Sequence, residues 1–304
     1  MSSLHGKPAG AGLLLALIGS VAFSGKAIIV KLAYRHGVDA VTLIMLRMLF
    51  ALPLFALMAW WASRGKAGLS RQDWLGVLGL GFSGYYLASY LDFAALVYIS
   101  ASLERLILYL NPTVVMLLGW LMYRGRASFG QMLGMAVSYS GVMLVFGHEM
   151  NLDKASAASI GWGALLCVLS VFSYAIYLVY SGELVKRLGS LRLVGLATSV
   201  ACIFCIAQYL LTRPMATVMS LDADVIWLSV LNATLCTAAP VLLVMMAIER
   251  IGASAAAQMG MVGPLSTILM GVLILDEPFN GWMIAGTALV MAGITVFSRS
   301  APRQ

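Results

Sequence analysis

Long runs of apolar residues follow one another along the whole chain. An α-helix needs about 20 such residues to cross the hydrocarbon core of a bilayer. Ten segments of about this length are separated by charged residues, glycine or proline: 11–33, 41–62, 74–97, 101–123, 127–147, 160–181, 191–212, 224–248, 253–275 and 280–298. The pattern predicts an all-α integral membrane protein with ten transmembrane helices.

The composition agrees with burial in lipid. The chain has 304 residues, of which 62% are hydrophobic and 10% are charged, whereas a soluble domain is about 25% charged. A net charge of +7 is compatible with nucleic-acid binding, but the basic residues are scattered at segment ends and form no basic face. We therefore expect a lipid bilayer and a small-molecule substrate as partners, and no nucleic acid. A monomer is possible, and the sequence leaves the oligomeric state open.

The basic residues between the segments indicate an orientation. With the N-terminus in the cytoplasm, the inner ends hold Lys7, Arg64, Lys66, Arg71, Arg124, Arg126, Lys186, Arg187, Arg192, Arg250, Arg299 and Arg303. The outer ends hold only Lys31, Arg35, Lys154 and Arg213. Because cytoplasmic loops of membrane proteins are enriched in Lys and Arg, we expect both termini in the cytoplasm.

The chain contains an internal repeat, with 1–152 as the first unit and 153–304 as the second. The register that places Pro112 on Pro264 also places Gly134 on Gly286 and Gly141 on Gly293. Each unit holds five predicted helices, and five is odd, so the second unit enters the membrane in the opposite orientation. Inverted repeats are typical of secondary transporters, with the substrate site near the midplane between the units. A duplicated scaffold without a transport role is the alternative.

The two matching prolines stand near the middle of their predicted segments. A proline there removes a backbone hydrogen bond and kinks the helix. We therefore expect kinks at Pro112 and Pro264 beside the substrate site.

Five ionisable residues lie inside predicted spans: Lys26, Arg47, Asp92, Glu104 and Arg105. Each costs about 2.5–3.5 kcal/mol on insertion scales, so each needs a partner or a function. All five lie within about 5–11 Å of the outer end of their helices, at about 1.5 Å per residue. One interpretation is a salt-bridge network at an outer gate. The other is a substrate site for a carboxylate or a zwitterion, because three positive and two negative charges leave one cation over.

Further polar and aromatic residues are candidates for the same pocket: Tyr86, Tyr90, Tyr109, Asn111, Tyr174, Tyr177, Asn232 and Gln258. Tyrosine suits a pocket that is apolar and still forms hydrogen bonds. However, tyrosine also marks membrane interfaces. The histidines are far apart and the cysteines lie within apolar segments, so we predict no catalytic residue, no metal and no cofactor.

Several short motifs, in order, resemble the repeat of EamA-type carriers of the drug/metabolite transporter superfamily. The first copy holds the Leu46-Arg47 pair, Tyr98-Ile99-Ser100-Ala101-Ser102 and Asn111-Pro112. The second copy holds Ile251-Gly252-Ala253-Ser254-Ala255, Gly263-Pro264 and Leu275-Asp276-Glu277-Pro278. The first copy departs from the family pattern, because Arg124-Gly125-Arg126 replaces the acidic turn.

The resemblance implies a ten-helix carrier that works by alternating access without ATP. Such carriers include YddG-type exporters of aromatic and other neutral amino acids, general metabolite exporters and nucleotide-sugar carriers. We expect an exporter of small metabolites, above all amino acids, in a bacterial inner membrane. The alternatives are a carrier of another class, such as drugs or nucleotide-linked sugars, and a channel or non-transporting sensor. A membrane enzyme would need a clustered nucleophile, histidine pair or acid pair near one membrane face, and it is not expected because the histidines are dispersed.

Overall fold

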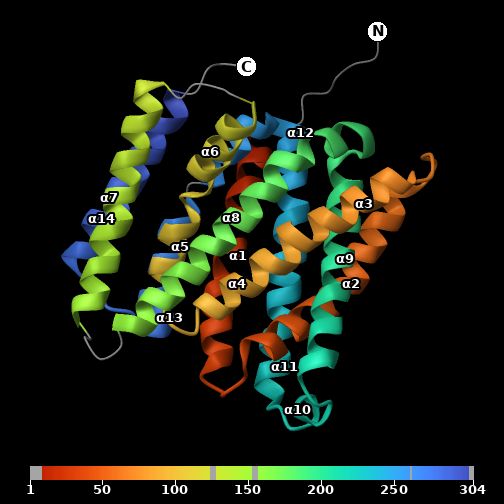
Figure 1. Ribbon diagram of the computed structural model, residues 1–304, viewed down its shortest axis with the longest axis horizontal. Coiled ribbons are helices and arrows are strands. Elements are labelled where there is room, and N and C mark those ends of the chain that lie inside the picture. The colour runs from red at the N-terminus through yellow and green to blue at the C-terminus, as the bar shows by residue number, and fades with distance from the viewer. Residues whose placement is uncertain (1–8, 124–127, 153–156, 261, 301–304) are drawn as a thin grey trace.

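The computed structural model describes residues 9–123, 128–152, 157–260 and 262–300, and every element within these ranges is a helix (Figure 1). The first half contains α1 (Ala9–Tyr34), α2 (Ala40–Ser63), α3 (Arg71–Leu80), the π-helical turn η1 (Gly81–Leu87), α4 (Ala88–Ala95), α5 (Ala101–Leu108), α6 (Asn111–Tyr123) and α7 (Phe129–Leu152). The second half contains α8 (Ala157–Leu188), α9 (Ser190–Thr212), α10 (Ala216–Met219), α11 (Ala223–Ala233), the π-helical turn η2 (Thr234–Ala238), α12 (Ala239–Gly260), α13 (Val262–Leu275) and α14 (Gly281–Arg299).

Eight helical runs in the described part of the chain are long and apolar enough to cross a membrane. They correspond to eight of the ten predicted segments, so the prediction of a multi-pass, all-helical membrane protein is confirmed. The segment 253–275 contains α13, a shorter apolar helix. The segment 74–97 corresponds to α3, η1 and α4, which are continuous from Arg71 to Ala95. Glycines and tyrosines lower the mean hydropathy of this run.

Two predicted boundaries are wrong. A break was expected between 248 and 253, but α12 continues to Gly260. The alanine-rich sequence after Gly252 has high helix propensity, which outweighs one glycine. Likewise α8 extends past 181 to Leu188, where Gly189 ends it with a φ of +83°. Its charged last turn is held by an ion pair between Arg187 and Asp73.

Pro112 does not stand in mid-helix. It follows Asn111 at the start of α6. Proline is tolerated there because the first backbone N–H groups of a helix have no intrahelical acceptor. The segment 101–123 is therefore interrupted at Tyr109 and Leu110 and restarts at Asn111. Pro264 comes three residues after Met261, which lies outside the described residues, so the kink expected at Pro264 stays a prediction.

The two halves pack against each other reciprocally. Helix α1 packs against α11, η2, α12 and α13, and α8 packs against η1, α4, α5 and α6. In Figure 1, α7 and α14 form a pair at one edge, while α2 and α9 lie side by side at the other. Both pairs are antiparallel. Gly134 of α7 meets Gly293 of α14 and Gly141 meets Gly286. Met48 of α2 meets Cys202 of α9, and Ala59 meets Gly195.

The connections gather at two ends of the molecule, which we name outer and inner after the predicted orientation. At the outer end, Arg213 pairs with Asp39 at 3.2 Å, and Arg35 donates to the Leu275 carbonyl at 3.0 Å. At the inner end, Arg192 donates to Ser63 Oγ at 3.1 Å. Five residues used to predict the orientation lie outside the described residues: Lys7, Arg124, Arg126, Lys154 and Arg303.

Candidate functional site

A central cavity of ≈300 Å³ lies where the two halves meet. Its lining comes from α1, α2, η1, α4, α5, α6, α8, α9, η2 and α12. Seven of the predicted site residues line it: Lys26, Arg47, Asp92, Arg105, Tyr109, Asn111 and Tyr174. Both halves therefore build the cavity, although its charged side chains come from the first half alone.

Four of the five membrane-embedded charges form a network. Lys26 forms an ion pair with Asp92, and its Nζ lies 3.6 Å from Glu104 Oε1. Arg105 Nε lies 3.9 Å from Glu104 Oε2. Glu104 is fully buried and pairs with these cations from behind the cavity lining. The network joins α1, α4 and α5, as the interpretation of mutual pairing requires.

Arg47 stands apart from this network. Its side chain is 5% exposed and lines the cavity. Nε donates to Thr237 Oγ1 at 3.0 Å, and the guanidinium lies 5.2 Å from the centre of the Phe93 ring. Among the described residues, Nη1 has no hydrogen-bond partner and no carboxylate lies within 4.0 Å of the guanidinium. A buried charge without a counter-charge is costly, so Arg47 suits an anionic group that enters the cavity.

The two π-helical turns both reach the cavity. Gly84 and Tyr85 of η1 line it, and so does Thr237 of η2. Thr237 Oγ1 donates to the Asn232 carbonyl at 2.8 Å while it accepts from Arg47. A π turn inside a helix frequently marks a functional site. Here η2 provides the hydroxyl that orients the unpaired guanidinium.

Aromatic rings form much of the remaining wall. Phe23 lies beneath two cations, 5.8 Å from Lys26 Nζ and 5.9 Å from the Arg105 guanidinium. Tyr177 does not line the cavity. It packs edge-on against Tyr85 and stacks on Tyr174, which do line it. The predicted Tyr177 is thus a support for the wall.

Three other predicted residues, Tyr86, Tyr90 and Asn232, do not line the cavity. Tyr86 packs against Phe82 and Phe204, and Tyr86 and Tyr90 both lie against the apolar core between α1, α2, α4 and α9. Asn232 is 1% exposed and is not part of the lining, and its side-chain amide has no partner among the described residues. Gln258 lies in α12, and its side chain falls outside the described residues.

Helical spacing locates lining residues that the candidate set omitted. Tyr85 and Ser89 precede Asp92 by seven and three residues and share its face. Phe23 precedes Lys26 by three residues, and Phe55 follows Arg47 by eight. Residues three or four apart are neighbours on a helix. Counting in these steps from the buried charges would therefore have selected this face and not the face that carries Tyr86.

The cavity continues toward the inner end. A second cavity of ≈480 Å³ shares Phe23, Arg105 and Tyr174 with it and extends along α1 to Ala16 and along α12 to Ile248. Apart from the residues shared with the central cavity, most of its lining is apolar, with Ser20 and Ser24 as polar members. A path therefore leads from the charged centre toward the inner end.

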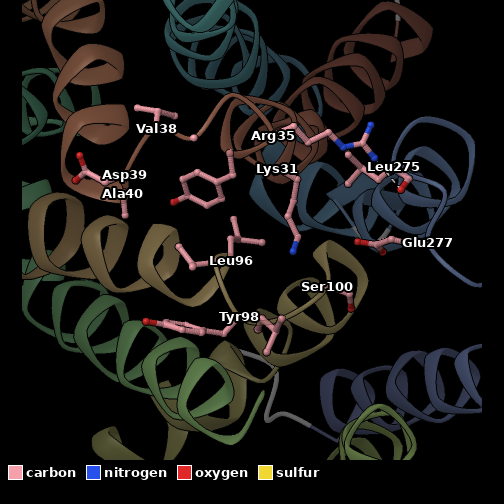
Figure 2. A pocket seen from close by; sticks show the side chains of 14 residues that line it. Lys31, Arg35, Val38, Asp39, Ala40, Leu96, Tyr98, Ser100, Leu275 and Glu277 are labelled. Atoms are coloured by element: carbon pink, nitrogen blue, oxygen red, sulfur yellow. Dashed lines mark hydrogen bonds between the residues drawn. The ribbon is translucent and has the colours of Figure 1, made fainter. Parts of the chain in front are cut away.

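A separate pocket of ≈730 Å³ opens at the outer end. Figure 2 shows Lys31 pointing into it, with Glu277 and Ser100 nearby. This outer pocket and the central cavity share no lining residue. On α1, Ala27 and Val30 lie between the two and are fully buried, and Phe93 is fully buried between them on α4. The outer end is therefore closed above the ion-pair network.

Comparison with known proteins shows the family to which this chain belongs. The model of the EamA-like transporter family matches residues 10–147 and, a second time, residues 161–299. An uncharacterized transporter of Bacillus subtilis, YcbK, is 32% identical over 295 residues, which cover 95% of this chain and 93% of the relative. An uncharacterized transporter of Archaeoglobus fulgidus is 26% identical over 284 residues, covering 93% and 95%. A solved crystal structure aligns with a TM-score of 0.62 at 19% identity, covering 97% of this chain and 99% of that chain, and so shares the fold.

Proposed function

Because this chain belongs to the EamA-like transporter family, we propose that it is a secondary carrier that exports small metabolites, above all neutral or aromatic amino acids. Membership makes it a multi-pass membrane transporter of the drug/metabolite superfamily rather than an enzyme. The substrate class, the direction and the alternating-access mechanism are the proposal.

The architecture behind this mechanism is ten helices in two inverted five-helix repeats, residues 1–152 and 153–304. Three observations support it. Corresponding helices pair antiparallel, as α2 with α9 and α7 with α14. Each half carries one π-helical turn in its third helix. The family model matches each half once. Inverted halves that meet at a midplane site are how many secondary carriers alternate access.

The proposed orientation places both termini in the cytoplasm of a bacterial inner membrane. Among the described residues, the inner end carries most of the Lys and Arg outside the spans, as at Arg71, Lys186 and Arg192. With this orientation, the cavities describe an inward-facing state: the central site continues toward the cytoplasm and is closed to the outside.

The observation that carries the substrate assignment is the unpaired guanidinium of Arg47 in the central cavity. A substrate carboxylate satisfies it, and the rings of Phe23, Tyr85 and Tyr174 fit an apolar or aromatic body. The volume of ≈300 Å³ lies at the lower end of the usual range for ligand pockets. This suits an amino acid and is small for a nucleotide-linked sugar.

A thermal-stability screen tests this assignment. The purified carrier is heated with each of the 20 amino acids, with nucleotide-linked sugars and with cationic drugs. We expect neutral amino acids with apolar or aromatic side chains to raise the Tm, because a ligand that binds only the folded state stabilises it. Stabilisation by sugars or drugs alone would assign another substrate class, and no stabilisation by any compound would favour a channel or a sensor.

A further inference from the structure

Two opposite charges face the central cavity with spare hydrogen-bonding capacity. Arg47 has an unpartnered Nη1, and Asp92 has an Oδ1 that is buried and receives no hydrogen bond from the described residues. The Asp92 side chain is 4% exposed, and its other oxygen pairs with Lys26. Arg47 comes from α2 and Asp92 from α4, so a ligand between them contacts two helices of the first half.

The Lys26 ammonium lies close to two carboxylates. Its Nζ is paired with Asp92 and lies 3.6 Å from Glu104 Oε1. A small rotation of the lysine side chain can therefore move the ammonium from one carboxylate to the other. Removing a buried charge from all its partners is strongly destabilising, and this movement avoids that, since Lys26 remains paired throughout.

We propose that Asp92 selects substrates that carry an ammonium group, and that a zwitterionic substrate displaces Lys26 from Asp92 onto Glu104. This inference rests on the proposed function and names the recognition within the same site. The substrate carboxylate binds Arg47, the substrate ammonium binds Asp92, and Lys26 then pairs with Glu104 beside Arg105.

In this arrangement every charged group has a partner of opposite charge. Before binding, Arg47 lacks an anion, while Lys26 and Arg105 share two acids. A zwitterion adds no net charge, yet it gives Arg47 a carboxylate and Asp92 a replacement cation. A plain carboxylate satisfies Arg47 and leaves Lys26 on Asp92. A plain amine displaces Lys26 and leaves Arg47 unpaired.

The displacement also reaches the outer barrier. The Lys26–Asp92 pair joins α1 to α4 next to Ala27 and Phe93, the buried residues that separate the cavity from the outer pocket. When the substrate ammonium replaces Lys26, this link between the two helices is lost. Substrate binding therefore weakens the closed outer end, which is the coupling that alternating access needs.

The test compares ligands that differ in one charge. Binding of L-phenylalanine, 3-phenylpropionate and 2-phenylethylamine to the purified full-length carrier is measured by calorimetry, with L-leucine and 4-methylpentanoate as a second pair. We expect the wild type to bind each amino acid about 10- to 100-fold more tightly than its carboxylate analogue, the range for one charge-assisted hydrogen bond. Asp92→Asn should abolish this preference and leave carboxylate binding within about threefold.

Two further variants are expected to change amino-acid affinity in opposite directions. Lys26→Gln removes the competing ammonium, so it should bind the amino acids more tightly than the wild type. Glu104→Gln removes the acid that receives Lys26, so it should weaken amino-acid binding and leave 3-phenylpropionate unchanged. Each variant is first checked for a single symmetric peak in size-exclusion chromatography.

The outcomes separate the inference from the function on which it rests. If the wild type binds amino acids and Asp92→Asn still prefers them to their carboxylate analogues, the inference is overturned and the proposed function stands. Weaker amino-acid binding by Lys26→Gln also overturns the inference, and this variant decides the question if Asp92→Asn does not fold. A wild type that binds no amino acid contradicts the proposed function itself.

Discussion

Arg47 is a buried guanidinium in an otherwise apolar helix, held by one hydroxyl and one aromatic ring. Thr237 accepts from Nε, and Phe93 lies against the guanidinium face. These contacts orient the group without neutralising its charge. The residue is therefore kept ready for an anion, and this is why the substrate assignment depends on it.

Replacement of Arg47 tests this role. Arg47→Ala should weaken L-phenylalanine binding by about 10- to 100-fold, because a charge-assisted hydrogen bond is lost. Arg64→Ala is the matched control: Arg64 ends the same helix, is exposed, and stacks on Trp60 at 3.7 Å. Calorimetry should show less than about a twofold change for this control. Equal losses in both variants would show that any arginine of α2 has this effect and would remove Arg47 from the site.

Asp39 gives a prediction of pH dependence. It caps α2 by accepting from the backbone of Val41 and Thr42. Partial burial by itself raises the pKa of Asp39, but hydrogen bonds from Thr42 and Arg213 outweigh it and hold the pKa below its ordinary value. The folded pKa is the lower one, so ionised Asp39 contributes stability above about pH 3.9, and this is lost as the pH falls through the folded pKa.

The comparison for Asp39 is with Asp39→Asn, which keeps the cap and loses the charge. At pH 7 the wild type should have the higher Tm, and the difference in unfolding free energy should be less than about 1 kcal/mol, since the Arg213 pair is exposed. The difference should shrink below about pH 4. A Tm difference that is the same at pH 7 and pH 3 would argue against the role of the charge.

The buried charges were the most informative part of the sequence at this scale. Lys26, Asp92 and Arg105 were predicted together and do line one cavity. The sequence could not decide which cation is left over, because Lys26 and Arg47 lie at similar depths. The choice depends on side-chain reach across α1, α4 and α5, and these helices are positioned by packing between the halves.

Among the elements, the α13–α14 turn closes the outer end. Glu277 accepts from the backbone of Ala101 at 2.7 Å and from Ser102 Oγ at 2.6 Å, so it caps the N-terminus of α5. An anion is favoured there by the unpaired N–H groups and the helix dipole. The turn of the second half is thus bound to the first half at the outer end.

Glu277→Gln should loosen this contact. The loss of stabilising free energy is about 1–2 kcal/mol for a charge at a helix N-terminus in a partly buried setting. A membrane-impermeant thiol reagent should therefore label a cysteine introduced at Leu96 faster in this variant than in the wild type. The control is Asp276→Asn, because Asp276 adopts a φ of +60° that asparagine also tolerates. Labelling at the same rate in wild type and Glu277→Gln would exclude this turn as part of the outer closure.

The α7–α14 pair depends on close backbone approach. A Cβ at Gly141 would lie 2.6 Å from the Gly286 carbonyl oxygen, whereas one at Gly147 would have nothing within 4 Å. We expect Gly141→Ala to lower the Tm, with overpacking costing about 1–3 kcal/mol. Gly147→Ala should leave the Tm unchanged or raise it slightly, since alanine favours helix. Equal Tm values for the two variants would contradict the packing described for this pair.

Helix positions were predictable from the sequence where apolar runs are bounded by charge or glycine, as in α2 and α9. The π-helical turns were not, because local periodicity does not reveal an extra residue per turn. Tyr85 and Ser89 were missed for another reason: their spacing from Asp92 places them on its face, and the buried charges were not used to choose between the faces. The continuation of α12 was missed for a different reason, since Gly252 was given more weight than the alanines that follow it.

At the scale of the whole molecule, the two halves are alike in packing and unlike in chemistry. Reciprocal contacts of α1 and α8 give the molecule two similar halves, while Lys26, Arg47, Asp92, Glu104 and Arg105 all belong to the first. In the proposed mechanism, this symmetric packing would provide the two positions that alternating access requires.

Counterflow tests the central claim most directly. Proteoliposomes that contain the purified carrier are loaded with unlabelled L-phenylalanine and diluted into labelled L-phenylalanine. A carrier with one site that alternates between two sides should accumulate label transiently, with a rate that saturates, and Arg47→Ala should abolish the accumulation. Linear flux that neither saturates nor depends on the internal amino acid would contradict the account and indicate a channel.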